Sequence, residues 1–270
     1  MFKKTILLTG ASGKIGTLVR NSLCKDYNLI LFCRSKINDL RKNEMYLKGD
    51  ITDYREIENA TQGVDIIIHM AAISGNKLLN SVKFRKDLWK VNGLGDYNVF
   101  EAARKARVSR LIYGSSHHVI GLYSAGEIID EKVPYKPDSM YGVTKCFTES
   151  MGYLYAKKAN LSVICLRIGA LRDHPTEERH LAVWISPRDM KHLILCAINA
   201  PASAQYEIVY GVSNNTRKWW DISHAKSLLG YNPQDDAEKY ASQVIKEPIE
   251  KWIDRVKCHG SETVDPPFMS

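Results

Sequence analysis

A tyrosine and a lysine four positions apart, Tyr141 and Lys145, form the first pattern in this chain that could do chemistry. In a helix, residues four apart project from the same face one turn apart, so the lysine ammonium can lie near the phenol. A nearby cation favours phenolate, which turns a phenol with an ordinary pKa of about 10 into a usable general base. Such a tyrosine can take the proton of a substrate hydroxyl while a hydride leaves the carbon that bears this hydroxyl.

The spacing alone does not identify the site, because it occurs twice. The chain has 14 tyrosines, and Tyr153 with Lys157 repeats the pattern. On one helix the two tyrosines would be about 18 Å apart along the axis, so a given site can use only one pair. The context favours Tyr141, which follows a Pro-Asp-Ser turn and lies 25 residues after Ser116.

A glycine-rich turn near the start of the chain predicts a nucleotide site. Residues 5–9 are an apolar run of strand length, and Gly10, Gly13 and Gly16 follow before an amphipathic stretch. Strand, tight turn and helix in this order direct the helix N-terminus at the pyrophosphate of a dinucleotide. The same spacing also occurs in plain strand-to-helix turns, but a second strand at 28–33 follows at the distance a dinucleotide-binding unit requires.

The end of that second strand bears on the choice of cofactor. Enzymes that prefer NAD usually carry an acid there for the ribose 2′-hydroxyl, whereas a basic residue accommodates the 2′-phosphate of NADP. Here Arg34 and Ser35 follow the strand, and no acid appears before Asp39. We therefore expect NADP to be preferred, the alternative being that Arg34 simply points into solvent.

The remaining pattern predicts alternating strands and helices. Such alternation gives a Rossmann-type α/β fold, a doubly wound parallel sheet with ligands at the carboxyl ends of its strands. We expect a cofactor-binding core at 1–168 and a small substrate-binding lobe at 169–270 within one compact unit. The expected strands are 45–48, 64–70, 110–113, 161–167 and 205–210, and the expected helices are one beginning at 52–53, 86–107, 138–160, 187–200 and 220–229.

Composition excludes several classes of protein. With 270 residues, 44% hydrophobic and 25% charged, the chain is typical of a globular protein, and no apolar run approaches a membrane span of about 20 residues. The six cysteines lack metal-binding spacing, so we expect thiols and no metal. The net charge of +8 is scattered, which suits an anionic cofactor and substrate better than nucleic acid. We expect a cytoplasmic location.

Taken together, these motifs resemble the extended short-chain dehydrogenase/reductase family, whose order and spacing they follow over about 160 residues. The resemblance implies that Tyr141 is the acid/base, that Ser116 hydrogen-bonds the reacting oxygen, and that Lys145 holds the nicotinamide ribose and lowers the tyrosine pKa. It also implies that Asn92 supports the lysine through water. The implied NAD(P)-binding residues are Gly10, Ser12, Gly13, Lys14, Ile15, Gly16, Arg34, Ser35, Asp50, Ile51, Met70, Ala71, Ala72, Asn92, Tyr141, Lys145 and Ile168.

A narrower similarity to uronate dehydrogenases runs over nearly the whole chain. It rests on 115–121, 166–169, 184–189 and especially 211–221. Those enzymes oxidise the C1 hydroxyl of a hexuronic acid to an aldarolactone and reduce the nicotinamide. The substrate contacts implied by position are Ser74, Ser116, His117, His118 and Arg179.

Two of these substrate contacts, Arg179 and His118, have a purely structural alternative. Three positions also differ from the residues that the family carries there. Arg179 could grip a substrate carboxylate with two parallel hydrogen bonds, or it could simply pair with a neighbouring glutamate. His118 could be a satisfied structural histidine. Uronate dehydrogenases carry an acid at Arg34, asparagine at His117 and serine at Ala170, so NAD is the family default and the sugar contacts differ here.

The sequence therefore favours an NAD(P)-dependent dehydrogenase acting on glucuronate, galacturonate or a similar acidic sugar. A sugar-nucleotide epimerase or reductase of the same family is the second hypothesis, although the short C-terminal lobe argues against a bulky nucleotide sugar. A non-catalytic NADP-sensing protein is the third. We expect a homo-oligomer, because members of this family often pair through the helices that here contain Asn92 and Tyr141.

Overall fold

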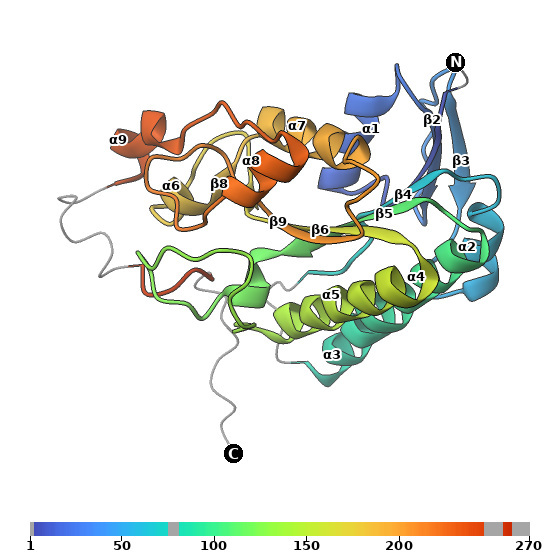
Figure 1. Cartoon of the computed structure of the whole chain (residues 1–270), viewed down its shortest axis with the longest axis horizontal. Coiled ribbons are helices and arrows are strands. Elements are labelled where there is room, and N and C mark those ends of the chain that lie inside the picture. The colour runs from blue at the N-terminus through green and yellow to red at the C-terminus, as the bar shows by residue number, and fades with distance from the viewer. Residues whose placement is uncertain (1–2, 75–80, 246–255, 261–270) are drawn as a thin grey trace. The chain divides into compact units, whose positions relative to one another are not determined.

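The apolar runs of the sequence form a seven-stranded sheet in the order β3-β2-β1-β4-β5-β6-β9 (Figure 1). The structure is a computed structural model that describes residues 3–74, 81–245 and 256–260. The strands from β3 through β2, β1 and β4 to β5 pair in parallel. The strands are β1 (Thr5–Thr9), β2 (Asn28–Cys33), β3 (Glu44–Lys48), β4 (Ile66–His69), β5 (Arg110–Ser116), β6 (Ser162–Ile168) and β9 (Tyr206–Gly211). The predicted Rossmann-type α/β fold is confirmed.

The strand order reverses between β1 and β4, which is the switch point where doubly wound sheets bind ligands. The chain divides into two units, each built from stretches far apart in sequence. The first unit comprises Met1–Gly114, Phe147–Cys165 and Ala202–Glu207. The second comprises Ser115–Cys146, Leu166–Pro201 and Ile208–Ser270.

In the first unit, α1 lies on one side of the strands while α2 and α4 lie together on the other (Figure 1). Asp53 begins α2 as predicted, because its carboxylate accepts hydrogen bonds from the amides of Arg55 and Glu56 at 2.9 and 3.3 Å. The helices of this unit are α1 (Lys14–Leu23), α2 (Tyr54–Ala60), α3 (Val82–Trp89) and α4 (Asp96–Lys105).

The helix predicted at 86–107 is divided by a π-helical segment, Lys90–Gly95, between α3 and α4. Gly93 and Gly95 weaken the α-helix in this segment, since glycine disfavours helix by about 1 kcal/mol relative to alanine. Such wide turns often mark functional positions, and this one contains the fully buried Asn92.

The second unit gathers the loops after β5 and β6 around a core that includes Trp220, Val119 and Tyr210. The helix predicted from Trp220 begins later, because the Asp221 carboxylate accepts a 2.8 Å bond from the amide of Ser223 and turns the chain there. Its shorter elements are β7 (Ala170–Leu171), α6 (His180–Val183), β8 (Trp184–Ile185), α7 (Pro187–Ile198), α8 (Ser223–Leu229) and α9 (Ala241–Val244).

The helix α5 (Met140–Ala159) runs from the second unit into the first, where it lies beside α4. None of the described helices is long and apolar enough to cross a membrane.

Candidate functional site

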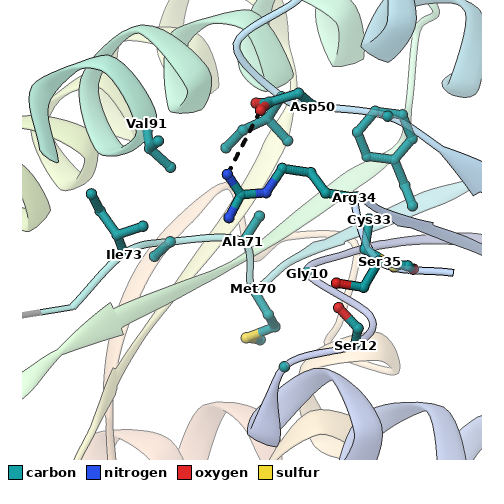
Figure 2. A pocket seen from close by; sticks show the side chains of 15 residues that line it. Gly10, Ser12, Cys33, Arg34, Ser35, Asp50, Met70, Ala71, Ile73 and Val91 are labelled. Carbon is teal, nitrogen blue, oxygen red and sulfur yellow. Dashed lines mark hydrogen bonds and ion pairs between the residues drawn. The ribbon is translucent and has the colours of Figure 1, made fainter. Parts of the chain in front are cut away.

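A pocket at the carboxyl ends of β1, β2 and β4 contains most of the predicted cofactor residues (Figure 2). The space inside it, open solvent at its mouth included, is about 710 Å³. The predicted residues that line it are Gly10, Ser12, Gly13, Arg34, Ser35, Asp50, Ile51, Met70, Ala71 and Ala72. The pocket also includes residues that were not among the predicted cofactor-binding residues: Phe32, Cys33, Gly49, Ile73 and Val91.

Gly10 makes the close approach of β1 and β4 at this pocket possible. Its φ of +69° is a left-handed conformation, and a Cβ there would lie 2.6 Å from the backbone nitrogen of Ala71. Glycine at this position therefore lets the backbone after β1 pack directly against the backbone after β4, where both line the pocket.

Arg34 and Asp50 supply the charged side chains among the pocket-lining residues. The Arg34 guanidinium extends across the mouth toward Asp50, with Nη1 3.9 Å from Oδ2 (Figure 2). Its side chain is 71% exposed, so an incoming anion can recruit it at little cost. The other Asp50 oxygen accepts a 2.9 Å bond from the amide of Thr52.

A buried polar network behind the pocket was not predicted from the sequence. Thr9 Oγ1 lies 2.6 Å from His69 Nδ1 and accepts a bond from the amide of Ala71 at 3.3 Å. His69 Nε2 donates to Asp96 Oδ1 at 3.0 Å. Asp96 Oδ2 accepts from Tyr113 at 2.7 Å and from a threonine of α5, also at 2.7 Å. The network links β1, β4, β5, α4 and α5 and thereby fixes the strand ends that line the pocket.

Asn92 also acts on this loop. Its side-chain oxygen accepts from the amide of Ile73 at 2.9 Å, and its side-chain nitrogen donates to the Ile73 carbonyl at 2.8 Å. The amide therefore holds the backbone that follows Ala72, and its support of Lys145 through water stays a prediction. Ser74, the predicted substrate contact of this loop, is exposed and precedes residues that the structure does not describe.

The predicted catalytic residues of the second unit lie around the turn after β5. The Tyr141 ring stands edge-on to the His118 ring at 5.6 Å between centroids, and Lys145 Nζ lies 5.6 Å from the Tyr141 ring centroid. Ser116 Oγ accepts a bond from the amide of His118 at 3.3 Å. Lys145 is 1% exposed, so its charge acts in a poorly solvated place.

Gly142 allows Tyr141 to reach this turn. A Cβ at Gly142 would lie 2.3 Å from the carbonyl oxygen of His118, so any larger residue would push the helix away. Ser139 precedes α5, and its Oγ accepts a 3.1 Å bond from the amide of Gly142, which fixes the helix start.

The rival pair, Tyr153 and Lys157, has the same geometry but a different environment. Lys157 Nζ also lies 5.6 Å from the ring centroid of its tyrosine. The Tyr153 side chain, however, belongs to the first unit, is 53% exposed and packs edge-on against Tyr206. The surroundings, and not the spacing, distinguish Tyr141.

His118 is oriented by a buried carboxylate. Both oxygens of Asp138 lie 2.8 Å from His118 Nδ1, so this nitrogen donates to the carboxylate. With the proton on Nδ1, a neutral His118 offers the lone pair of Nε2 as an acceptor. The structural alternative for His118 therefore holds for Nδ1, which is paired with Asp138.

His117 is fully enclosed and neutral. Its Nδ1 lies 3.0 Å from the carbonyl oxygen of Ile168, which can only accept, so the proton is on Nδ1. Desolvation, followed by the charges of His118 and Arg179, lowers the pKa of His117 well below its ordinary value. An asparagine can donate through its amide nitrogen, whereas His117 presents only a lone pair on Nε2.

That lone pair faces Arg179, whose Nη1 is 3.4 Å from His117 Nε2. Arg179 Nη2 pairs with Glu177 at 3.1 Å, which is the pairing with a neighbouring glutamate that the sequence left open. The side chain is only 10% exposed, and burial lowers its pKa from the ordinary value. The arginine is therefore held beside the His117–His118 turn.

The structure thus gathers two sets of predicted residues. Most cofactor residues of the first unit share the pocket, while Ser116, His117, His118, Tyr141 and Arg179 are linked in the second. Lys14, Ile15 and Gly16 lie in α1 and do not line the pocket, and Ile168 lies at the end of β6 in the second unit. All six cysteines are thiols, and among the described residues no three metal-binding side chains gather.

A doubly wound sheet with a glycine-rich pocket at its switch point defines a nucleotide-binding protein of the Rossmann class. The pattern of the NAD dependent epimerase/dehydratase family matches residues 6–226. The chain belongs to this family.

Among its relatives, the uronate dehydrogenase of Pseudomonas putida is 34% identical over 90% of this chain and 88% of its own length. The NAD-dependent glucose-6-phosphate dehydrogenase of Haloferax volcanii is 32% identical over 91% of this chain and 98% of its own. A mutant of the Agrobacterium tumefaciens uronate dehydrogenase, solved in complex with NAD, covers 100% of both chains with a TM-score of 0.88 and 31% identity. The predicted resemblance to uronate dehydrogenases is confirmed, and these relatives are dehydrogenases of the predicted class.

Proposed function

We propose that this protein oxidises the C1 hydroxyl of a hexuronic acid, such as glucuronate or galacturonate, to an aldarolactone with a nicotinamide cofactor. The observation that carries the proposal is the cluster around the His117–His118 turn, where the Tyr141–Lys145 pair and the buried Arg179 meet. The Tyr141–Lys145 pair suits the removal of a proton from a hydroxyl, and Arg179 suits the binding of a carboxylate.

In this mechanism, Tyr141 removes the hydroxyl proton while Lys145 stabilises the phenolate. Ser116 Oγ hydrogen-bonds the same oxygen, and Nε2 of His118 accepts from a second sugar hydroxyl. Arg179 binds the carboxylate and so sets which carbon faces the tyrosine. The bound nicotinamide supplies the acceptor for the hydride. We place the cofactor with residues 1–168 and the substrate lobe with 169–270.

A panel of initial rates tests this proposal, with reduced nicotinamide followed by absorbance. The sugars are glucuronate, galacturonate, glucose 6-phosphate, glucose and UDP-glucose, each with NAD and with NADP. Turnover of a uronate, exceeding that of glucose, is the expected result. An epimerase returns its hydride to the sugar and a reductase consumes reduced cofactor, so UDP-glucose is also analysed for changed sugar products, with reduced cofactor added in parallel. Conversion of UDP-glucose alone would support the epimerase or reductase hypothesis, and cofactor binding without any conversion would support a sensing protein.

Oxidation of a sugar phosphate is a second candidate. A buried guanidinium binds phosphate as readily as carboxylate, and a relative of almost full coverage is named for glucose 6-phosphate. Both substrates carry their anion at C6 and their reacting hydroxyl at C1. The panel separates them by the ratio of kcat/KM values.

We propose further that the cofactor is NADP in preference to NAD. Arg34 extends over the pocket and lies 3.9 Å from Oδ2 of Asp50, the acid among the lining residues, whose Oδ1 accepts from the amide of Thr52. The end of β2 therefore offers a cation to a 2′-phosphate, and no acid follows in the sequence before Asp39.

Replacing Arg34 tests the cofactor preference. Arg34→Ala should lower kcat/KM for NADP roughly 10- to 100-fold and leave NAD nearly unchanged, since one charge-assisted contact is lost. Lys36→Ala, an exposed cation outside the pocket, is the matched control. A wild-type preference for NAD above tenfold would defeat the proposal.

We also propose a homo-oligomer that pairs through α4 and α5. The first unit exposes large apolar side chains on these helices and on the π segment between α3 and α4: Leu94, Tyr97, Phe147, Tyr153 and Leu154. Light scattering that gives a mass of only one 30.6 kDa chain would contradict pairing.

A further inference from the structure

The stretch Cys258–Gly260, called here the 258–260 segment, is docked in the second unit by backbone hydrogen bonds. Its first residue pairs antiparallel with Ser124. Its next two amides donate to the carbonyls of Tyr123 and Gly121 at 2.9 and 2.8 Å. Three consecutive residues are therefore held in register, far from the catalytic helix in sequence.

The ring of His259 anchors the segment. It is fully buried and stacks on Trp219 at 4.8 Å between centroids, with 17° between the planes. Trp220 Nε1 donates to His259 Nδ1 at 3.2 Å, so the histidine proton is on Nε2. Burial lowers the pKa of His259 to about 4, which keeps the ring neutral near pH 7.

The anchored segment contacts the residue that would bind the substrate carboxylate. The backbone carbonyl of His259 accepts a 3.3 Å bond from Arg179 Nη1, the same nitrogen that faces His117 Nε2. Two neutral acceptors therefore fix one edge of the guanidinium without neutralising its charge. A backbone carbonyl is a rigid partner only as long as its segment stays docked.

The segment also contacts the carboxylate that orients His118. A Cβ at Gly260 would lie 2.1 Å from Asp138 Oδ2, so the glycine backbone packs directly against this oxygen. Asp138 in turn holds Nδ1 of His118 at 2.8 Å. One short segment thus touches one proposed substrate-binding side chain, Arg179, and the carboxylate that orients the other, His118.

We propose that the 258–260 segment is a working part of the substrate site, in which His259 positions Arg179 and Gly260 positions the Asp138–His118 pair. The inference rests on the proposed function. It makes selectivity for an anionic sugar depend on residues about 80 positions after the arginine. A docked segment presents Arg179 ready to bind, and a displaced one leaves it misoriented.

Variants in the segment test the proposal by steady-state kinetics. Gly260→Ala and His259→Ala should each raise KM for glucuronate roughly tenfold, with kcat within about twofold and with the Kd for reduced cofactor unchanged. His259→Asn keeps an acceptor for Trp220 and should restore most of the affinity. Lys257→Ala, which changes only an exposed side chain, is the control and should match the wild type.

Two results would overturn the inference: an unchanged KM in Gly260→Ala, or equal losses in kcat, cofactor affinity and melting temperature, which indicate a merely structural role. If the wild type oxidises no sugar, the proposed function fails, and hydrogen exchange decides the inference. The amides of residues 259 and 260 should then exchange faster in Arg179→Ala than in the wild type. Unaltered exchange would contradict the coupling.

Discussion

Arg179, the proposed carboxylate-binding residue, is a buried charge with several fixed partners. Its described hydrogen bonds go to Glu177, His117 and the carbonyl of His259, which use three of the five guanidinium N–H groups. Remaining donors can then form the two parallel bonds that a carboxylate favours. Lysine has a similar charge but lacks this fork.

Arg179→Lys should therefore raise KM for a uronate roughly 10- to 100-fold while leaving the Kd for cofactor unchanged, because charge is kept and the geometry is lost. Arg172→Lys changes an exposed arginine of the same loop and serves as the control. Steady-state kinetics measures the KM for the uronate, and a fluorescence titration measures the Kd for the cofactor. Equal KM values in the two variants would place carboxylate binding elsewhere.

For single residues, the sequence predicted which side chains could react, and the structure added their hydrogen-bond partners and tautomers. Tyr141 with Lys145, and Arg34 at a strand end, were readable from spacing. The neutral tautomer of His117 was not, because it depends on the Ile168 carbonyl, which a different strand brings to within 3.0 Å. The Thr9–His69–Asp96 network was likewise invisible, since it joins residues 60 and 27 positions apart.

At the scale of elements, the start of α5 positions Tyr141, the proposed general base. Helix propensity favours alanine over glycine by about 1 kcal/mol, so Gly142 costs the helix stability. The His118 carbonyl, 2.3 Å from where a Cβ would lie, explains this cost. Gly142 lowers the stability of the helix, but it lets Tyr141 approach the turn after β5.

Gly142→Ala should accordingly lower kcat at least tenfold, because a small displacement of a catalytic group is expensive, with the Kd for cofactor unchanged. Ser150→Ala, at an exposed position of the same helix, is the control and should retain full activity. Circular dichroism would verify that both variants stay folded. Full activity of the glycine variant would mean that the turn relaxes without moving Tyr141.

The order of strands and helices followed from hydrophobic pattern, whereas the π segment did not. Gly93 and Gly95 mark a weak point in the helical run from 86 to 107, but they do not specify the wider turn that places Asn92 against the backbone of Ile73. The late start of α8 depended on Asp221, a side chain that turns the backbone locally.

At the scale of the whole molecule, buried histidines make stability depend on pH. Desolvation lowers the pKa of His117, His180 and His259, while a bond from His180 lowers that of Glu177 to about 2. Unfolded histidines bind protons below about pH 6.5, whereas these folded ones bind them only at lower pH. Their stabilisation is therefore complete above that pH and is lost as the pH falls toward the folded pKa values.

Urea unfolding should show a free energy of unfolding that falls between pH 6.5 and 4 by up to about 1.4 kcal/mol per pH unit for each such histidine. His259→Asn should reduce this slope by about one proton, whereas His174→Asn, at an exposed position, should not. Stability that stays level across this range would contradict the neutral burial of these rings.

The two units each combine three separate stretches of chain, an arrangement that the sequence did not predict. Local pattern defines elements, but the assignment of residues 115–146 to the second unit arises from packing between distant segments. The predicted boundary at 168–169 concerned ligand binding, and it stays a prediction.

The most direct test of the central claim compares Tyr141→Phe with Tyr153→Phe in uronate oxidation. Both remove one hydroxyl from a Tyr-x-x-x-Lys pair with the same 5.6 Å separation between ammonium and ring. Loss of the general base should lower kcat of Tyr141→Phe by about 10²- to 10⁴-fold while Tyr153→Phe stays at the wild-type rate. Retained activity in Tyr141→Phe, with folding and cofactor binding intact, would contradict the account.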